Sequence, residues 1–257
     1  MTTGAYLKSA EQIVRGAGDI ARRGFGRSPV VRLKPAGEPV TEADLQVERH
    51  ILGTLREQYP NHGFLSEEAG QVGDDCEYRW ILDPIDGTKY YARGIPLYSI
   101  SLALERRGEP IVGVVFNPET GQMFCGANDR DARLNDVEIR CSQAKRLEET
   151  TICLEIPSRD SPASQRKWAM EKMGTLVDHV GRVRMLGVGA LGLCFAAAGA
   201  FDAYLNLGSG SQHYDIAAGR IIVSAAGGQF VPVGERIVAG PAVLCEQLLD
   251  LLGLAAR

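Results

Sequence analysis

The sequence predicts a mixed α/β protein (α+β in its first part) with two packed subregions that meet near residues 145–150. Two amphipathic helices open the chain, an antiparallel meander fills its middle, and strands alternate with helices in its second half. The 257 residues are 45% hydrophobic and 23% charged, which is a globular composition at a length of one to two domains. We therefore expect an N-terminal half at residues 1–147 and a C-terminal half at 148–257.

The first half begins with two predicted helices. Apolar residues recur at the helical period over residues 5–25. Thr41, followed by Asp44 three residues later, has the spacing of a capping box and predicts a second helix to about residue 58. A short strand at 30–33 and a loop at 34–39 connect the two helices.

Strands dominate the middle of the chain. The alternation and the turn residues between the runs indicate an antiparallel meander. The predicted strands cover residues 78–83, 98–105, 111–116 and 122–125, with turns at 107–108 and 118–121.

In the second half, strands and helices alternate. Strands are predicted at 151–156, 183–186 and 201–205, and helices at 164–177, 190–198 and 215–226. Gly227 and Gly228 mark the end of the last helix. The apolar run 185–201 contains four glycines and predicts a buried strand, turn and helix rather than a membrane span.

The overall charge of the chain excludes some classes of partner. The net charge is −4, and no run of five basic residues is present, so we expect no nucleic-acid polymer and no membrane as partner. The six cysteines contain no Cys-x-x-Cys pair, and the first residues lack a signal-peptide pattern. We therefore expect free thiols and a cytoplasmic protein.

The segment from Asp83 to Thr88, Asp-Pro-Ile-Asp-Gly-Thr, carries the densest chemical signal. Two carboxylates three residues apart on a sharp turn can converge on one point, and such convergence is stable mainly with a cation between them. Oxygen ligands without His or Cys favour Mg²⁺, Ca²⁺ or Mn²⁺. A polar turn without any metal is the competing interpretation.

Three further acidic sites stand at the predicted ends of elements. Glu67 and Glu68 follow an apolar strand, Asp215 opens a helix, and Asp44 lies in the first turn of another. Each has an ordinary alternative, which is a solvated acidic loop for the glutamates and helix capping for the aspartates. Together they supply what an oxygen-ligated site for several metal ions would need.

Four segments together resemble the inositol monophosphatase family of Mg²⁺-dependent, lithium-sensitive phosphatases. They are Thr41–Asp44, Ser66–Gly70, Trp80–Thr88 and Tyr214–Gly219, and their order and spacing match the family along nearly the whole chain. The resemblance implies a layered α/β/α/β/α sandwich of the sugar-phosphatase type, with the metal site between the halves, and a homodimer.

The resemblance also implies a set of metal ligands. By position, Glu67, Asp83 and the carbonyl of Ile85 match the ligands of a first ion, and Asp83, Asp86 and Asp215 those of a second. Glu67 would also touch a third, weaker ion. We therefore expect two or three Mg²⁺, with Mn²⁺ as a possible substitute.

The remaining site residues follow from the same resemblance. Asp44 and Thr88 match the pair that orients the attacking water, with Glu67 counted beside them as catalytic. Gly87 and Thr88 would offer N–H groups to the phosphate. The other residues expected to face the substrate are Gly187, Gly189, Asn206 and Asp215.

Departures from the family pattern bear on the substrate. Asn206 stands where inositol-cleaving members carry a Glu, with two extra residues before Asp215, and Tyr214 replaces a frequent Trp. Lys89 directly after Thr88 resembles the pattern of the bisphosphate-nucleotidase branch. Tyr90 and Tyr91, with their spacing to Gly94–Pro96, resemble the pattern of the inositol branch. His213 could face the substrate or be an ordinary surface histidine.

The function predicted is Mg²⁺-dependent hydrolysis of a small phosphate monoester, of an inositol, another cyclitol or a sugar, by an activated water. A 3′(2′),5′-bisphosphate nucleotidase and a histidinol-phosphate phosphatase are the alternatives within this class. A non-catalytic scaffold that binds a metal or ligand is the alternative outside it.

Overall fold

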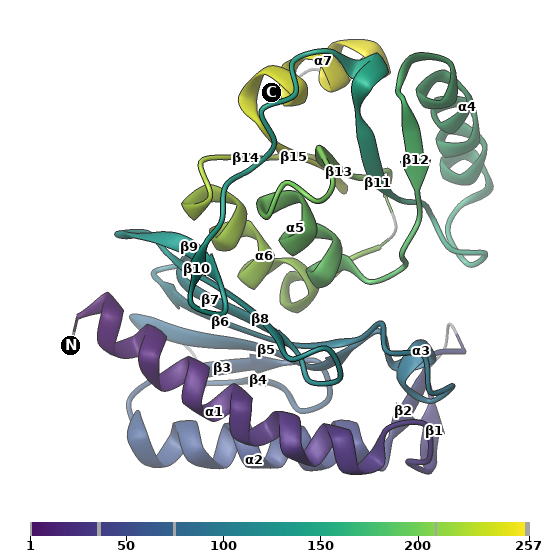
Figure 1. Ribbon diagram of the computed structural model, residues 1–257. Helices are drawn as coiled ribbons and strands as arrows, with labels where there is room; N and C mark the ends of the chain where they lie inside the picture. The colour runs from purple at the N-terminus through teal and green to yellow at the C-terminus, as the bar shows by residue number, and fades with distance from the viewer. Residues whose placement is uncertain (1, 35–36, 74–75, 209, 255–257) are drawn as a thin grey trace.

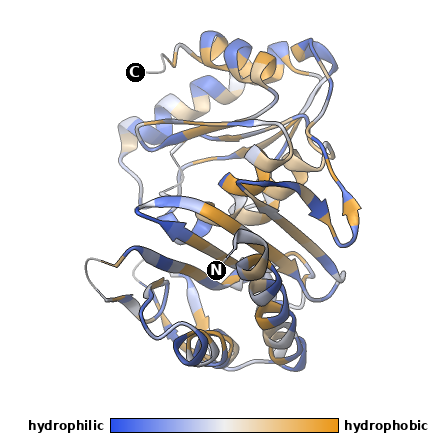
Figure 2. Ribbon diagram, turned by 90° about the vertical axis from the view of Figure 1, so that its left-hand side faces the viewer, coloured by the Kyte–Doolittle hydropathy of each residue, from blue (hydrophilic) through white to orange (hydrophobic). Residues whose placement is uncertain are grey.

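The computed structural model describes residues 2–34, 37–73, 76–208 and 210–254, and its elements stack in five layers (Figure 1). Helices α1 and α2, an eight-stranded sheet, helices α5 and α6, a five-stranded sheet, and helices α4 and α7 follow one another. The predicted α/β/α/β/α sandwich is confirmed. In Figure 2 the outer helices alternate hydrophilic and hydrophobic segments, as expected for helices that pack on one side only.

The large sheet belongs to the first half of the chain and contains the predicted meander. Its strands run in the order β10-β9-β8-β7-β6-β5-β3-β4, and β3 and β5 are its parallel pair. The strands are β3 (Gly63–Ser66), β4 (Gly70–Val72), β5 (Tyr78–Asp86), β6 (Ser99–Arg106), β7 (Glu109–Asn117), β8 (Gln122–Ala127), β9 (Arg130–Leu134) and β10 (Val137–Glu138).

Helices cover one face of this sheet, and a small hairpin lies beside it. Both predicted N-terminal helices form, as α1 (Thr3–Gly24) and α2 (Glu42–Gln58), and the capping box between Thr41 and Asp44 is present. The hairpin pairs β1 (Val30–Leu33) with β2 (Pro39–Thr41). Residues 35–36 of the predicted loop lie outside the described residues. A single turn of helix, α3 (Thr88–Tyr91), follows β5.

The small sheet belongs to the second half. Its order is β12-β11-β13-β15-β14, with β11 parallel to both neighbours. The strands are β11 (Thr151–Glu155), β12 (Arg182–Arg184), β13 (Ala203–Asn206), β14 (Gln229–Val233) and β15 (Arg236–Gly240). The helices around it are α4 (Ala163–His179), α5 (Gly189–Ala197), α6 (His213–Ala225) and α7 (Ala242–Leu252), and a short 3₁₀ turn at Leu147–Glu149 precedes β11.

Strand alternation directs two acidic residues into the middle layer. On β5, Trp80 and Leu82 pack beneath α1 and α2, so Ile81 and Asp83 face the other way, toward α6. On β11, Leu154 packs toward α4 and α7, and Glu155 therefore faces inward. The two sheets thus present carboxylates to the same interior space.

Helix α6 lies unusually close to the large sheet because β7 carries a glycine beneath it. A Cβ at Gly113 would stand 2.4 Å from Ile221 Cγ2 and 2.5 Å from the carbonyl oxygen of Ala218. The absence of a side chain at Gly113 therefore fixes the distance between the halves.

Some boundaries differ from the sequence prediction. β5 continues past Asp83 to Asp86 across an irregularity, because pairing with β6 resumes between Asp86 and Ser99. Helix α6 begins at His213, two residues before the predicted start. β14, β15 and α7, for which no element is predicted after Gly228, complete the fold.

Two expectations about the chain's chemistry can be compared directly with the structure. In the described residues no helix is long and apolar enough to cross a membrane. Within the run 185–201 the predicted buried helix forms as α5, but the predicted buried strand does not, because β12 ends at Arg184 and Met185 is 47% exposed. All six cysteines are free thiols. The division at residue 147 falls between the two sheets, and the independence of the two halves as folding units stays a prediction.

Candidate active site

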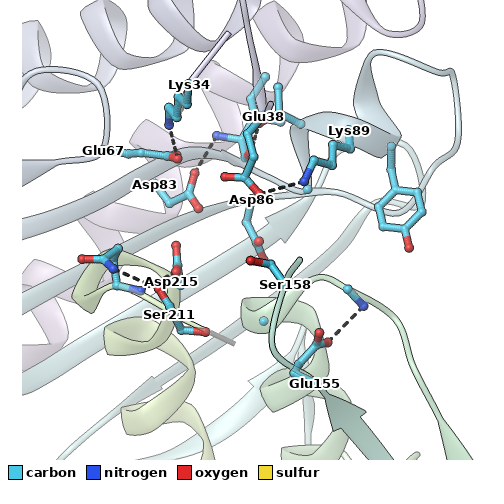
Figure 3. Close-up of a pocket in the computed structure, with 18 of the residues that line it drawn as sticks. Lys34, Glu38, Glu67, Asp83, Asp86, Lys89, Glu155, Ser158, Ser211 and Asp215 are labelled. Carbon is cyan, nitrogen blue, oxygen red and sulfur yellow. Dashed lines mark hydrogen bonds and ion pairs between the residues drawn. The ribbon is translucent and has the colours of Figure 1, made fainter. Parts of the chain in front are cut away.

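A cavity of about 790 Å³ lies between the two halves and collects most of the predicted site residues (Figure 3). The first half contributes the upper wall in the figure, and the second half contributes Glu155, Ser158, Ser211 and Asp215 below. The predicted site residues in its lining are Glu67, Asp83, Ile85, Asp86, Gly87, Thr88, Gly187, Gly189 and Asp215.

The end of β5 positions two of the carboxylates. Asp83 is 2% exposed, and its Oδ1 accepts the N–H of Ile85 at 3.0 Å. Asp86 Oδ2 accepts the N–H of Ala190 at 2.9 Å, in the first turn of α5. This bond joins the two halves, and the positive end of the helix dipole favours the charged form of Asp86.

Asp215 reaches the same cavity from the first turn of α6. Its Oδ2 accepts the N–H of Gln212 at 2.6 Å and completes a capping box. The capping interpretation and the site interpretation are therefore both compatible with the structure, because one oxygen caps the helix while the residue lines the cavity.

The carboxylates form a buried acidic cluster, and Lys34 pairs with one of its members, Glu67. Burial, followed by the charges of Glu67, Asp86 and Asp215, raises the pKa of Asp83 well above its usual value. Burial and the charge of Asp215 do the same to Asp86. Burial raises the pKa of Asp215 to about 7. Such a cluster favours binding of protons or cations.

The donor set fits a hard divalent cation. The groups are carboxylate oxygens and one backbone carbonyl, without His or Cys, which suits Mg²⁺ or Mn²⁺. In the described ranges no group of three or more acidic, His or Cys residues is arranged to hold one metal ion. Lys34 forms ion pairs with Glu67 and Glu68 at the edge of the cavity.

Asp44 and Thr88 meet beside the carboxylates. The Thr88 hydroxyl lies 3.2 Å from Asp44 Oδ1 and 2.9 Å from the carbonyl oxygen of Ile85. Asp44 is fully buried and lies behind Thr88, which lines the cavity. Burial raises the pKa of Asp44 to about 6, although bonds from Thr41 oppose the rise.

Glycines form the cavity wall where the backbone turns. Gly87 has φ +90°, and a Cβ there would stand 2.9 Å from the carbonyl oxygen of Leu97. Gly187, with φ +69°, lies against Tyr90, whose hydroxyl donates to the carbonyl of Leu186 at 2.6 Å. Both turns require a left-handed conformation that side chains disfavour.

Asn206 and His213 lie outside the cavity lining, in contrast to Tyr214. Asn206 is fully buried, where its Oδ1 accepts the N–H of Gly208 and its Nδ2 donates to Ser211 Oγ, both at 2.8 Å. His213 bonds to the buried Glu105 on β6. Tyr214 lines the cavity between the acidic groups.

Several residues that line the cavity were not predicted from the sequence, among them Lys34, Glu155 and Ser158. Glu155 Oε1 accepts the N–H of Gly187 at 3.0 Å, and burial raises the pKa of Glu155 to about 7. A carboxylate at the end of a buried strand, as at Asp83, is the signal that could have identified it.

Comparisons with known proteins agree along nearly the whole chain. The model of the inositol monophosphatase family matches residues 5–252. The inositol-1-monophosphatase of Mesorhizobium japonicum is 35% identical over 260 residues, covering 97% of this chain and 96% of that protein. The Nus factor SuhB of Pasteurella multocida is 31% identical over 254 residues, 94% of each chain.

A solved structure shows the same similarity along nearly the whole chain. The crystal structure of the extragenic suppressor protein suhB from Bartonella henselae has a TM-score of 0.89 and 30% identity, covering 96% of this chain and 98% of that chain. The resemblance that the four sequence segments predict is thereby confirmed.

Proposed function

Since the chain belongs to the inositol monophosphatase family and is therefore a metal-dependent phosphoric monoester hydrolase, we propose that its substrate is a small polyol, cyclitol or sugar phosphate. The observation that carries this proposal is one cavity lined by Glu67, Asp83, Asp86 and Asp215, with Thr88 beside them. A doubly charged phosphate can enter such a cavity only when cations neutralise the carboxylates.

Magnesium is the proposed cofactor, in two or three copies, with Mn²⁺ as a substitute. Glu67, Asp83 and the carbonyl of Ile85 would hold one ion, and Asp83, Asp86 and Asp215 another. Such ions supply charge neutralisation, a lower pKa for water and stabilisation of the leaving oxygen. The buried carboxylates with raised pKa values support this assignment.

Thr88 and Asp44 orient the attacking water in this proposal. The Thr88 hydroxyl can donate to Asp44 Oδ1, 3.2 Å away, which leaves its oxygen free to accept a proton from water. Asp44, with its pKa raised to about 6, is a stronger base than an exposed aspartate. The proton released by the water would thus move to Thr88 Oγ1, while the proton of Thr88 moves to Asp44.

Backbone groups of the turn after β5 bind the phosphate. Gly87 and Thr88 line the cavity, and the left-handed conformation of Gly87 is of the kind that can turn successive N–H groups toward one anion. Gly187 and Gly189 form the wall on which the rest of the substrate would lie. No covalent intermediate with the enzyme is required.

A phosphate-release panel tests the proposal. The substrates are inositol 1-phosphate, fructose 1,6-bisphosphate, adenosine 3′,5′-bisphosphate and histidinol phosphate, each with Mg²⁺ and with EDTA. We expect Mg²⁺-dependent release from the first two. A strong preference for the nucleotide or for histidinol phosphate would replace the substrate assignment, and no release from any ester would support the scaffold alternative.

Three further properties are proposed from family membership: inhibition by lithium, a homodimer and a cytoplasmic location. Lithium should reduce the Mg²⁺-dependent rate, because it competes at an oxygen-ligated cation site. Light scattering on the purified chain would measure the mass, and twice the mass of one chain is expected.

A further inference from the structure

Glu48 is a buried glutamate outside the cavity lining. It lies on α2 four residues after Asp44, so both side chains project from one face of the helix. Its exposure is 6%. None of the ion pairs formed within the described ranges includes Glu48, so its charge is stabilised by hydrogen-bond donors instead.

Those donors lie at the end of β3 and in the turn that joins it to β4. Glu48 Oε1 accepts the hydroxyl of Ser66, the N–H of Ala69 at 2.9 Å and the N–H of Glu68 at 3.3 Å. Hydrogen bonds to an ionised carboxylate are about twice as strong as neutral ones. One oxygen therefore accepts hydrogen bonds from residues on both sides of Glu67, the first residue of the turn.

The opposite side of the turn is held by the sheet. The N–H of Glu67 donates to the carbonyl of Leu82 on β5 at 3.1 Å. The turn is thus fixed between α2 and β5. Its conformation has a chemical consequence, because Glu67 and Glu68 have identical side chains. The backbone of the turn, together with the ion pairs of Glu68 to Arg32 and Lys34, directs Glu67 toward the cavity.

The two glutamates have different surroundings. Glu67 lines the cavity next to Asp83. The Glu68 side chain is 1% exposed and pairs with Arg32 and Lys34 of the β1–β2 hairpin. A rotation of the turn would present the wrong carboxylate to the cation.

We propose that Glu48 is a positioning residue for the metal site, holding the turn so that Glu67 projects into the cavity. The inference rests on the proposed function, since it assumes that Glu67 binds a cation there. Glu48 itself touches neither substrate nor metal. Outer-shell partners of metal ligands typically contribute about 10–100-fold to metal affinity.

Mg²⁺ binding to the intact, metal-free chain, measured by calorimetry without substrate, is the test. Glu48→Ala should weaken Mg²⁺ binding by about 10–100-fold. Glu48→Gln keeps an acceptor oxygen and should weaken it less. Glu57→Ala, at an exposed position on the same helix, is the control and should bind Mg²⁺ as the unaltered chain does.

Turnover gives the second readout. The Mg²⁺ concentration for half-maximal rate should rise in Glu48→Ala, while kcat at saturating Mg²⁺ stays near that of the unaltered chain. A merely structural residue would lower kcat without a selective change in the Mg²⁺ requirement. Adding Ser66→Ala to Glu48→Ala should cause no further loss, because both act through one turn.

The outcomes separate this inference from the proposed function. Unchanged Mg²⁺ binding in Glu48→Ala would overturn the inference, whatever the activity. If that variant fails to fold, unchanged binding in both Glu48→Gln and Ser66→Ala overturns it instead. An unaltered chain that binds Mg²⁺ but hydrolyses no phosphate ester would refute the proposed function and leave the binding comparison valid.

Discussion

The two halves of the chain contribute different kinds of groups to the cavity. The first half supplies Asp83 and Asp86 from the end of one central strand, and Thr88 directly after it. The second half supplies Asp215 from a helix start, and its other contributions come mostly from connecting segments, such as Ser158 and Gly187. Asp83 and Asp86 thus stand on a strand, and Asp215 stands at a helix start. Ser158 and Gly187 stand on loops.

This difference predicts separate roles for the two halves, which variants can test. Changes in the first half should alter metal binding and turnover. Changes in the second half, Asp215 excepted, should alter which substrate is selected.

Asp83→Asn should have the largest effect. Asn keeps an oxygen that can accept the Ile85 N–H but loses the charge that would hold cations. Replacing a residue that only hydrogen-bonds to a metal ligand typically lowers metal affinity or activity by about 10–100-fold. Loss of a ligand itself should therefore lower kcat/KM by more than about 100-fold. Phosphate release measures the rate, and circular dichroism should show an intact fold. Near-normal rates in Asp83→Asn would refute the metal assignment. The control is Asp19→Asn, which makes the same chemical change at an exposed position on α1.

Thr88→Val should lower kcat by about 100-fold or more, because it removes the hydroxyl between Asp44 and the proposed water. Thr88→Ser retains that hydroxyl and should recover most of the rate. Steady-state kinetics at saturating Mg²⁺ measure both. Equal loss in the two variants would contradict a role for the hydroxyl alone, because Thr88→Ser keeps the hydroxyl and Thr88→Val keeps a methyl group.

The metal-free chain should become less stable as pH rises from 5 to 8. Burial raises the pKa of Asp44 to about 6, and of Asp215 and Glu155 to about 7, from ordinary values of 3.8 and 4.5. The folded protein therefore keeps protons that the unfolded chain releases, and this stabilisation, complete near pH 4, is lost as pH passes through 6–7.

Thermal unfolding in EDTA should show the effect as a midpoint lower by ~5 °C at pH 8 than at pH 5. Saturating Mg²⁺ should reduce the difference, because cations would replace the protons. A midpoint that rises with pH in EDTA would contradict the electrostatic description of both halves.

Gly113→Ala tests the packing between the halves. The new Cβ would stand 2.4 Å from Ile221 Cγ2, so α6 must shift at a cost of about 1–3 kcal/mol. Gly53→Ala on α2 makes the same chemical change where nothing lies within 4 Å, and should stabilise by up to ~1 kcal/mol. Chemical denaturation measures both, and equal effects would refute the close approach.

Glu155→Gln should have the smallest effect. The variant keeps the acceptor for the Gly187 N–H but loses a carboxylate on the substrate wall. KM for inositol 1-phosphate should rise by less than about 10-fold, the equivalent of one hydrogen bond. The Mg²⁺ requirement should stay constant. A changed Mg²⁺ requirement with constant KM would contradict the assignment of substrate selection to the second half.

Local patterns account for what the sequence could predict. The segment Asp83–Thr88 combines a strand end, a proline and a glycine, so its turn and its exposure to a cavity are encoded within six residues. The capping box at Thr41 is local too, and α2 begins where it predicts. The layered fold was accessible only through the family resemblance, since periodicity does not determine how sheets stack.

The rest depends on contacts between distant segments. Glu48 meets Ser66 and Ala69 across about twenty positions, so its role has no local sequence signature. Glu155 stands at a strand end, which is a local signal, but its bond to Gly187, 32 residues away, is not encoded locally. Asn206 was expected to face the substrate by alignment with the family. Its buried amide bonds to Gly208 and to Ser211, which lines the cavity, and its role toward the substrate stays a prediction.

A crystal structure of the chain with Mn²⁺ and inorganic phosphate would test the central claim most directly, since the anomalous signal of Mn²⁺ locates the ions. The account predicts ions ligated by Glu67, Asp83, Asp86 and Asp215, with phosphate against the N–H groups of Gly87 and Thr88. Ions bound elsewhere, or phosphate bound without any ion in this cavity, would contradict it.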